Sequence, residues 1–492
     1  RKSFGSTIRR YGYNADLNKY ANYDPTTTYP NIVTGTRSLI PGNDGFSDSD
    51  NRFLSAFGNL GYTYDSRYVL TLSARKDASN LFGLTTNDKW NLLWSAGAGW
   101  NLSNEKFYHS DLLPYLKLRA TYGFSGNIDP TKSAVTTIVY GLQTTYTAAP
   151  QATISQYANP ELRWEKVRMI NLAVDFQLKN NRIFGSIDVF FKHATDLYGP
   201  SELDYTTGAG SSITKNIASL KGSGVDIELN SLNINSKFKW YSKLNLSIYH
   251  DQVENYYDNS IKAGSTVTTS SPVFNHIIGK PLYAMYSYRY AGLDHTTGSP
   301  IGYLNGVPSQ DYNNIYSSKS NDDIVYSGSA IPTLYGSIGN TLSYKRISFT
   351  TQLMYKLSYY FRRQTIDYSN MLVRPNAANP DYLLRWKKPG DEQITNIPSF
   401  VYPIVNNRED IYVYSDQTVE KGDNIRLQYI NLNYQLDKNV IPSLPVKQIN
   451  IYLNVTNLGI IWRANNKGID PDFPQTTIPP SKSWTLGFKL TL

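Results

Sequence analysis

The chain has 492 residues, no cysteine and a formal net charge of +9 at neutral pH. The lack of cysteine in the sequence excludes disulfide frameworks and thiolate metal sites. Lys and Arg are scattered rather than clustered, so we expect no nucleic-acid partner. No run of about 18 apolar residues occurs, and no transmembrane helix is therefore predicted.

Tyrosine and tryptophan are unusually frequent, with 41 and 8 residues. Both side chains suit a membrane–water interface, because each is apolar with one polar end. A tyrosine-rich soluble β protein is the alternative at this point. The two are distinguished by the strand pattern along the chain.

The N-terminal region begins with Ser3–Tyr13, which can form a strand, followed by a long predicted loop over residues 24–50 that is rich in Thr, Asn, Asp, Gly and Pro. Strict period-two alternation starts near Leu54 and is clearest over residues 90–102 and 483–492. Such alternation indicates strands with one apolar and one polar face. Together with residues 3–13, 90–102 and 483–492, the predicted strands are 54–64, 68–75, 116–124, 170–178, 183–191, 225–229, 240–248, 282–290, 334–344, 347–359, 424–436 and 448–457.

The connections differ strongly in length. Turns at Asp65-Ser66, Asn180-Asn181 and Lys345-Arg346 are short, whereas several alternate connections are long and polar. The long predicted loops are 126–160, 195–222, 251–280, 291–330 and 360–421. Short turns on one side and long loops on the other are typical of outer-membrane barrels. We therefore predict an all-β fold, a transmembrane antiparallel β-barrel with about fourteen strands of membrane-crossing length.

Two details follow from the alternation. The phase changes within 424–436, which predicts a β-bulge near Tyr429. We also expect Trp90, Trp94, Ile170 and Trp484 to face lipid.

Candidate substrate-contacting residues come from the polar face and from aromatic loop ends. The candidates are Arg75, Lys117, Arg119, Asp175, Asp226, Glu228, Tyr256 and Tyr360. The polar residues would line a wet lumen, where they either contact substrate or keep the lumen hydrated and salt-bridged. The tyrosines would stack on a ligand or pack within their loops.

No catalytic, cofactor or metal site is predicted. The five histidines, at positions 109, 193, 250, 276 and 295, have no metal-ligand spacing. Asp470-Pro471-Asp472 is interpreted as a turn, and Arg362-Arg363 as a strand end at lipid headgroups. The alternating Tyr286, Tyr288 and Tyr290 are interpreted as girdle residues facing headgroups.

Several segments resemble the SusC/RagA-like TonB-dependent transporters of Bacteroidetes. The first are residues 68–79 (YVLTLSARKDAS) with Phe82-Gly83, and residues 94–100 (WSAGAGW). The others, in the family's order, are 116–123 (LKLRATYG), 159–165 (NPELRWE), 292–294 (GLD), 332–336 (PTLYG), 422–427 (GDNIRL), Asn457-Leu458 and 468–471 (GIDP). The similarity extends over most of the chain.

The resemblance implies a 22-stranded barrel, of which residues 1–492 would form the C-terminal portion. The plug domain, TonB box and N-terminal domain of the family are not recognised in this chain. Because only about fourteen of the 22 strands are found, we expect the chain not to close a barrel alone. The implied function is active import of oligomeric nutrients across the outer membrane of a Gram-negative, Bacteroidetes-like cell. Glycan oligosaccharides are the first expectation for the substrate and peptides the second.

The partners implied are a SusD-like surface lipoprotein, TonB–ExbB–ExbD, an N-terminal barrel and plug segment, and outer-membrane lipid. Two other classes stay open: a passive porin, and a structural or secretion-associated envelope barrel. An enzyme is not expected.

Overall fold

A computed structural model describes most of the chain. The described residues are 6–14, 28–30, 37–39, 45–80, 90–129, 134–141, 151–202, 206, 212–256, 263–268, 277–373, 379–438, 441–443, 445–474 and 479–491. Among them, no helix combines the length and apolarity needed to cross a bilayer.

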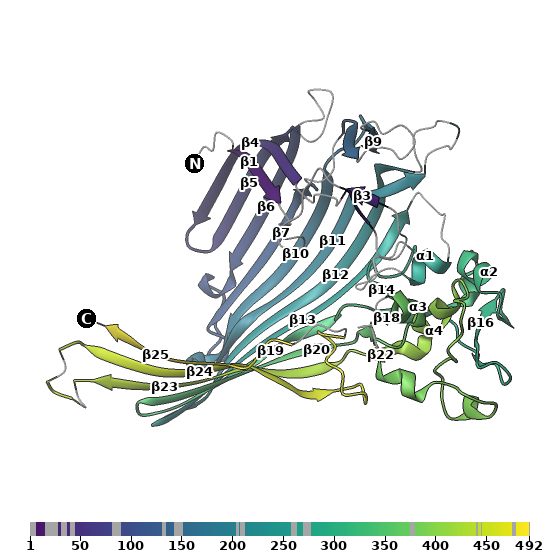
Figure 1. The fold of residues 1–492 in the computed structure, drawn as a ribbon. Coiled ribbons are helices and arrows are strands. Elements are labelled where there is room, and N and C mark those ends of the chain that lie inside the picture. Colours follow the sequence, from purple (N-terminus) through teal and green to yellow (C-terminus); the bar gives the residue numbers. More distant parts are fainter. Residues whose placement is uncertain are drawn as a thin grey trace.

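Fourteen strands form one antiparallel sheet whose order in space follows their order along the chain (Figure 1). Their bounds are β1 (Ser6–Asn14), β4 (Gly45–Tyr64), β5 (Tyr68–Ser79), β6 (Trp90–Asn101), β7 (Tyr115–Asn127), β10 (Glu165–Gln177), β11 (Ile183–Glu202), β12 (Ser212–Asn235), β13 (Phe238–Tyr256), β19 (Leu334–Tyr344), β20 (Ile347–Leu357), β23 (Asn424–Asp437), β24 (Gln448–Arg463) and β25 (Ser483–Thr491). The predicted strand count is confirmed, and the predicted strand at 3–13 corresponds to β1 over its described residues, Ser6–Asn14.

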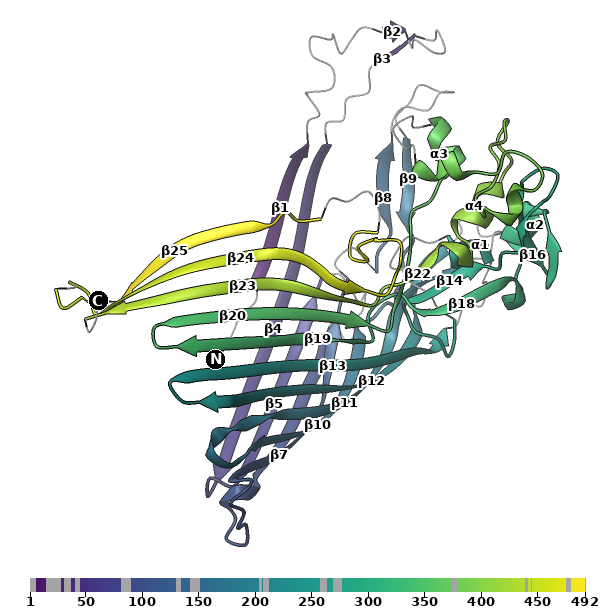
Figure 2. The same cartoon turned by 90° about the horizontal axis from the view of Figure 1, so that it is seen from below.

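The sheet is strongly bent, so that the strands near its two ends do not lie in one plane (Figures 1 and 2). Within the described residues, β1 pairs only with β4, and β25 pairs only with β24. The sheet is therefore open along both outer edges.

One face of the sheet is apolar across successive strands. A single row of opposed residues runs from β4 to β11 through Leu60, Leu72, Ala96, Tyr122, Ile170 and Phe191. Leu60 and Phe191 are 60% and 50% exposed, which is unusual for large apolar side chains unless lipid or another partner covers them. This apolar face is called the exterior face below, and the opposite polar face is called the lumen face.

The residues predicted to face lipid lie on the exterior face. Trp94, Ile170 and Trp484 are 40%, 37% and 68% exposed. Trp90 is half-buried, and the Lys76 ammonium lies 5.3 Å from its ring centroid. An aromatic ring beside a lysine at the edge of the apolar band is typical of the membrane–water boundary.

The predicted bulge is present on β23. Leu427 lies opposite Leu353 and Tyr429 lies opposite Gln352, so Gln428 has no opposed residue on β20. The ladder to β24 shifts at the same place. The extra residue exchanges the two faces, and for this reason the apolar residues before and after it both reach the exterior.

Connection lengths segregate as predicted. Tight connections join β4 to β5, β10 to β11, β12 to β13 and β19 to β20, whereas the long connections β7–β10, β13–β19 and β20–β23 leave from the opposite ends of the strands. The exception at that end is β11–β12, joined by residues 203–211 alone. The predicted loop 195–222 is wrong, however, because the β11–β12 ladder continues to Glu202 opposite Ser212. These strands have 20 and 24 residues, more than the roughly 9–11 needed to cross a membrane. Beyond the membrane both faces meet water, so the apolar alternation that reveals a strand disappears.

The connections β13–β19 and β20–β23 fold together into a lobe at the long-loop end of the sheet (Figures 1 and 2). Its elements are α1 (Ala263–Val267), β14 (Ala284–Tyr288), β15 (Gly292–Leu293), β16 (Pro300–Leu304), β17 (Val307–Ser309), α2 (Tyr312–Ser317), β18 (Ile324–Ser329), β21 (Tyr360–Arg362), α3 (Tyr368–Val373), α4 (Arg408–Val413) and β22 (Val419–Lys421). Two small hairpins stand elsewhere: β2 (Thr28–Pro30) with β3 (Arg37–Leu39), and β8 (Thr137–Gly141) with β9 (Gln151–Gln156).

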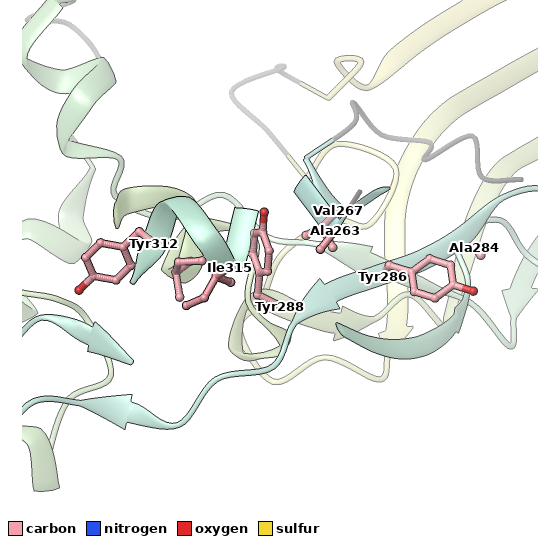
Figure 3. Packing of buried hydrophobic residues seen from close by; sticks show 8 residues of the cluster. Ala263, Val267, Ala284, Tyr286, Tyr288, Tyr312 and Ile315 are labelled. Carbon is pink, nitrogen blue, oxygen red and sulfur yellow. The ribbon is translucent and has the colours of Figure 1, made fainter. Parts of the chain in front are cut away.

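The lobe has its own apolar core. Tyr286 and Tyr288 of β14, only 3% and 0% exposed, pack with Ile315 of α2 and Ile411 of α4 (Figure 3). The predicted membrane strand 282–290 and the predicted headgroup girdle are therefore wrong. Strand β14 pairs with β18 in a separate two-stranded sheet, and its tyrosines are covered by protein instead of lipid.

Arg362 joins the parts of this lobe. Its guanidinium donates to the backbone oxygens of Tyr286 (2.7 Å) and Ser415 (3.0 Å) and to the Thr418 hydroxyl (2.9 Å). Burial lowers the pKa of Arg362 to about 10. The prediction that Arg362-Arg363 ends a strand at headgroups is thus wrong for Arg362, whose hydrogen bonds all remain inside the lobe.

Candidate functional site

The lumen face carries rows of polar residues across the middle of the sheet. One row runs from β7 to β13 through Arg119, Ala173, Asp188, Asp226 and Ser247. The next row runs through Lys117, Asp175, Ser186, Glu228 and Asn245. Because side chains alternate between faces, these residues are neighbours on one surface even though they come from five strands.

Arg119 is the centre of an ion-pair cluster on this surface. It donates two hydrogen bonds of 2.8 Å to the Asp175 carboxylate, one from Nε and one from Nη2. The same Nη2 lies 3.3 Å from Asp188 Oδ1. The fork geometry fixes the guanidinium between two carboxylates, so Arg119 and Asp175 neutralise each other across β7 and β10.

Glu228 and Asp226 of β12 contact polar side chains of the next strand, β13. Lys243 Nζ lies 2.9 Å from Glu228 Oε1, and the Ser247 hydroxyl donates to Asp226 Oδ1 at 2.6 Å. Both carboxylates keep further acceptor capacity, since an ionised carboxyl group can accept about four hydrogen bonds.

An aromatic pair lies beside these acids. The rings of Phe190 and Tyr249 stack with centroids 6.1 Å apart and an interplanar angle of 23°. Gly224 stands between them in the ladder, and a Cβ atom there would come within 2.4 Å of the Phe190 ring. The glycine is required for the rings to meet over β12. Lys192 places its ammonium 4.7 Å from the Phe190 centroid.

These groups border a hollow of about 610 Å³ on the lumen face. It is called the lumen hollow below, and its bordering side chains include Asp188, Phe190, Lys192, Asp226, Glu228 and Tyr249. Two predicted residues, Asp226 and Glu228, therefore lie together at one site. Asp188, Phe190, Lys192 and Tyr249, which also border the hollow, were not among the predicted candidates. The available signal was Phe190, an aromatic residue in the polar phase of an alternating strand.

The other predicted residues lie elsewhere. Arg75 of β5 donates from Nε to Asp77 Oδ1 at 2.5 Å. Lys117 lies opposite Asp175 at the end of the cluster around Arg119. Tyr256 ends β13 opposite Ala218, and Tyr360 belongs to the lobe, where its ring lies against Gly328. The structure does not bring Arg75, Tyr256 and Tyr360 to the lumen hollow.

The acidic turn before the last strand is neutralised by basic residues. Arg426 Nη2 lies 2.7 Å from Asp470 Oδ1 and 3.2 Å from Asp472 Oδ2. Lys356 Nζ lies 2.7 Å from Asp472 Oδ1. The interpretation of Asp470-Pro471-Asp472 as a turn agrees with this geometry. In the part of the chain that the structure describes, no group of three or more His, Asp or Glu side chains is arranged to hold a metal.

The alternating sheet, its apolar exterior face, its polar lumen face and its unequal connections define an outer-membrane β-barrel protein. Comparison with known proteins agrees with this class. The family model "TonB dependent receptor-like, beta-barrel" matches residues 2–282. The chain therefore belongs to the TonB-dependent receptor-like β-barrel family, whose members are non-enzymatic transport proteins of the outer membrane.

Curated relatives include TonB-dependent receptor P26 of Formosa agariphila, 28% identical and aligned over 96% of this chain and 46% of the relative. TonB-dependent receptor SusC of Bacteroides thetaiotaomicron is 24% identical over 89% of this chain and 44% of SusC. The chain thus spans about half the length of the curated relatives that it matches.

Among solved structures, that of the RagAB peptide transporter aligns with a TM-score of 0.71 at 22% identity, over 92% of this chain and 48% of the other. The similarity shows that the two share a fold.

Proposed function

We propose that the protein serves in active import of oligomeric nutrients across the outer membrane, with glycan oligosaccharides as the first substrate class and peptides as the second. The observation that carries the proposal is the lumen hollow. It combines a stacked aromatic pair with carboxylates and an ammonium group on the polar face of a membrane sheet.

The chemistry of the lumen hollow suits a sugar or peptide chain. An aromatic ring offers an apolar surface for the C–H face of a pyranose or for a peptide side chain. Asp188, Asp226 and Glu228 accept hydrogen bonds from hydroxyl or amide groups, whereas Lys192 donates. Opposite charges side by side favour ligands of mixed polarity over a single anionic chelate.

The proposed partners are TonB–ExbB–ExbD, which would supply energy, and a SusD-like surface lipoprotein, which would close the outer mouth. Family membership supports the first. The second is supported by the similarity to SusC and by the lobe, which stands at the long-loop end where substrate would enter. Peptides remain the second substrate class because a structural neighbour is described as a peptide transporter.

The experiment is a deletion of this gene, and separately of a neighbouring lipoprotein gene, followed by growth on defined polysaccharides, on peptides and under iron limitation. Loss of growth on one polysaccharide in both deletions supports glycan import with a lid lipoprotein. Loss confined to peptides selects the second class. A defect confined to iron limitation would refute import of oligomers.

Energy coupling needs its own measurement, since a passive porin would also show a growth defect. Uptake of a labelled oligomer should stop when TonB is deleted or the proton gradient is collapsed. Uptake that persists unchanged would indicate a porin. A structural or secretion-associated barrel would instead yield secretion components, without a lid lipoprotein, when the native complex is purified.

A further inference from the structure

The exterior face changes from apolar to basic near the long-loop ends of β10, β11 and β12. Along β10 the exterior residues are Ile170, then Arg168, then Lys166. On β11, His193 follows Phe191, and on β12, Lys221 follows Ser223. In the ladders, Arg168 lies opposite His193, and His193 lies opposite Lys221. The basic residues therefore form a row directly beyond the last exposed apolar side chains.

A hollow of about 440 Å³ lies on this part of the exterior face. Its border includes Arg168, Ile170, Phe191, His193, Lys221 and His250. We call it the basic exterior hollow. It opens on the opposite face of the sheet from the lumen hollow, because successive residues of a strand point to opposite sides, although Lys192 borders both.

The cationic groups of this hollow outnumber its acids, since Arg168, Lys192 and Lys221 border it together with Asp251 and Glu254. The nearby carboxylate of Glu254 lies 2.7 Å from His193 Nε2. Asp251 instead accepts from the backbone N–H of Leu282 at 2.9 Å. Among the described residues, Arg168 and Lys221 have no acidic group within ion-pair distance, and both side chains are exposed. They stand two strands apart, about 10 Å in a β-sheet.

We propose that the basic exterior hollow binds the phosphorylated headgroup of an anionic glycolipid in the outer leaflet of the membrane. Long loops mark the outer side of such barrels, so the basic row lies at the level of outer-leaflet headgroups. Arg168 and Lys221 would bind phosphate oxygens, for which a guanidinium and an ammonium are well suited. Acyl chains would lie on Phe191 and Ile170, which are 50% and 37% exposed.

Charge complementarity selects this occupant over a protein partner. The hollow continues directly into the lipid-facing band, so its ligand must be charged at one end and apolar at the other. The proposal is independent of what the barrel transports, because it concerns the exterior face alone.

The test uses the intact protein purified from its native outer membrane and delipidated in mild detergent. Binding of bisphosphorylated lipid A, fully dephosphorylated lipid A and inorganic phosphate is measured by native mass spectrometry. Wild-type protein should retain the bisphosphorylated lipid and bind the dephosphorylated lipid at least about tenfold more weakly, since each charge-assisted phosphate contact contributes about that factor. Millimolar inorganic phosphate should not displace the lipid.

The decisive variant is Arg168→Gln/Lys221→Gln, which should weaken binding of the bisphosphorylated lipid by at least about tenfold. The charge-preserving variant Arg168→Lys/Lys221→Arg should retain binding, which separates loss of the site from loss of folding. The matched control is Lys179→Gln/Lys345→Gln, which removes two exposed cations at the short-turn end and should leave binding unchanged. Equal binding of the two lipids, displacement by inorganic phosphate, or no loss in the Gln variant would overturn the proposal.

Discussion

The membrane sheet and the lobe at its long-loop end place the same residue types in opposite environments. Tyr62 and Tyr64 alternate along β4 and are 58% and 59% exposed. Tyr286 and Tyr288 alternate along β14 and are 3% and 0% exposed. The sheet shows its apolar face to the surroundings, whereas the lobe packs its apolar side chains around an interior of its own.

The comparison shows that period-two alternation predicts a strand with one apolar and one polar face. It does not predict whether lipid or protein covers the apolar face. Lipid covers the apolar face of a strand in the membrane sheet, and other protein elements cover it in the lobe. Arginines follow the same division. Arg119 lies partly exposed on the wet lumen face, whereas Arg408 is 1% exposed inside the lobe.

The largest effect is expected in the lobe interior. Arg408 Nη1 lies 2.6 Å from Glu409 Oε1, and Arg408 Nη2 donates to the backbone oxygen of Ser399 at 2.9 Å. Arg408→Ala leaves the Glu409 carboxylate buried without its cation, and we expect this to lower the free energy of lobe unfolding by about 3–5 kcal/mol. Limited proteolysis of the lobe across a urea series measures the change.

A control sharpens the comparison of the two regions. The double variant Arg408→Met/Glu409→Leu should recover most of the lost stability, because it removes both buried charges. In each variant the sheet should remain folded, which is seen as a change in its migration on an SDS gel when the sample is heated. Loss of the folded sheet together with the lobe would show that the two are not separate units.

Lysine substitutions at two neighbouring positions test which face of the sheet meets lipid. Trp94→Lys places a charge in the apolar band and should cost about 2–4 kcal/mol near the midplane, less toward the boundary. Ser95→Lys, one residue away, directs the charge to the lumen face and should be tolerated. The amount of folded protein in outer membranes measures both. Tolerance at position 94 but not at position 95 would mean that the two faces are assigned the wrong way round.

The aromatic pair of the lumen hollow allows a similar pair of neighbouring substitutions. Phe190 is only 7% exposed, and its ring supports the partly exposed Tyr249 that would contact a transported oligomer. Phe190→Ala removes this support, and uptake at limiting substrate should fall about 2- to 10-fold, corresponding to about 0.5–1.5 kcal/mol. Phe191→Ala removes a ring from the exterior face and should leave the uptake rate per folded molecule unchanged. Equal effects on uptake would argue against a substrate role for the lumen hollow.

The smallest effect concerns an acid in the lobe and its pH dependence. A hydrogen bond with His295, 2.6 Å from the carboxylate, together with donors from Trp386 and Gly390, lowers the pKa of Glu392 from 4.5 to about 2. Since the folded-state pKa is lowered, the stabilisation is present above about pH 4.5 and is lost as the pH falls toward 2.

Hydrogen exchange of residues 386–395, corrected for intrinsic rates, measures this effect. Glu392→Gln should reduce protection at pH 6, and the difference from wild type should become small as the pH falls to about 2. Glu161→Gln, remote from the lobe in sequence, should show no such difference. A difference that persists unchanged at pH 2 would exclude the carboxylate as its cause.

Much of the sheet was predictable because the membrane imposes a simple rule on each strand. Strand β6 shows the period-two pattern throughout, and the bulge at Gln428 was evident from the change of phase in β23. The lumen residues Arg119, Asp175, Asp226 and Glu228 were identified from the same pattern. The predicted strand at 282–290 failed because the same alternation occurs in β14, whose two faces are covered by the lobe.

The sequence by itself determined which residues share a face, since the side chains of a strand alternate whatever surrounds it. It also determined which ends of the strands carry the short turns and which carry the long loops. The change of phase in β23 determined the approximate position of the bulge. Only the tertiary structure decided that two long connections form one lobe, that Arg362 is buried there, and that Phe190 meets Tyr249 over Gly224. These depend on contacts between segments far apart in the chain, which no local period encodes.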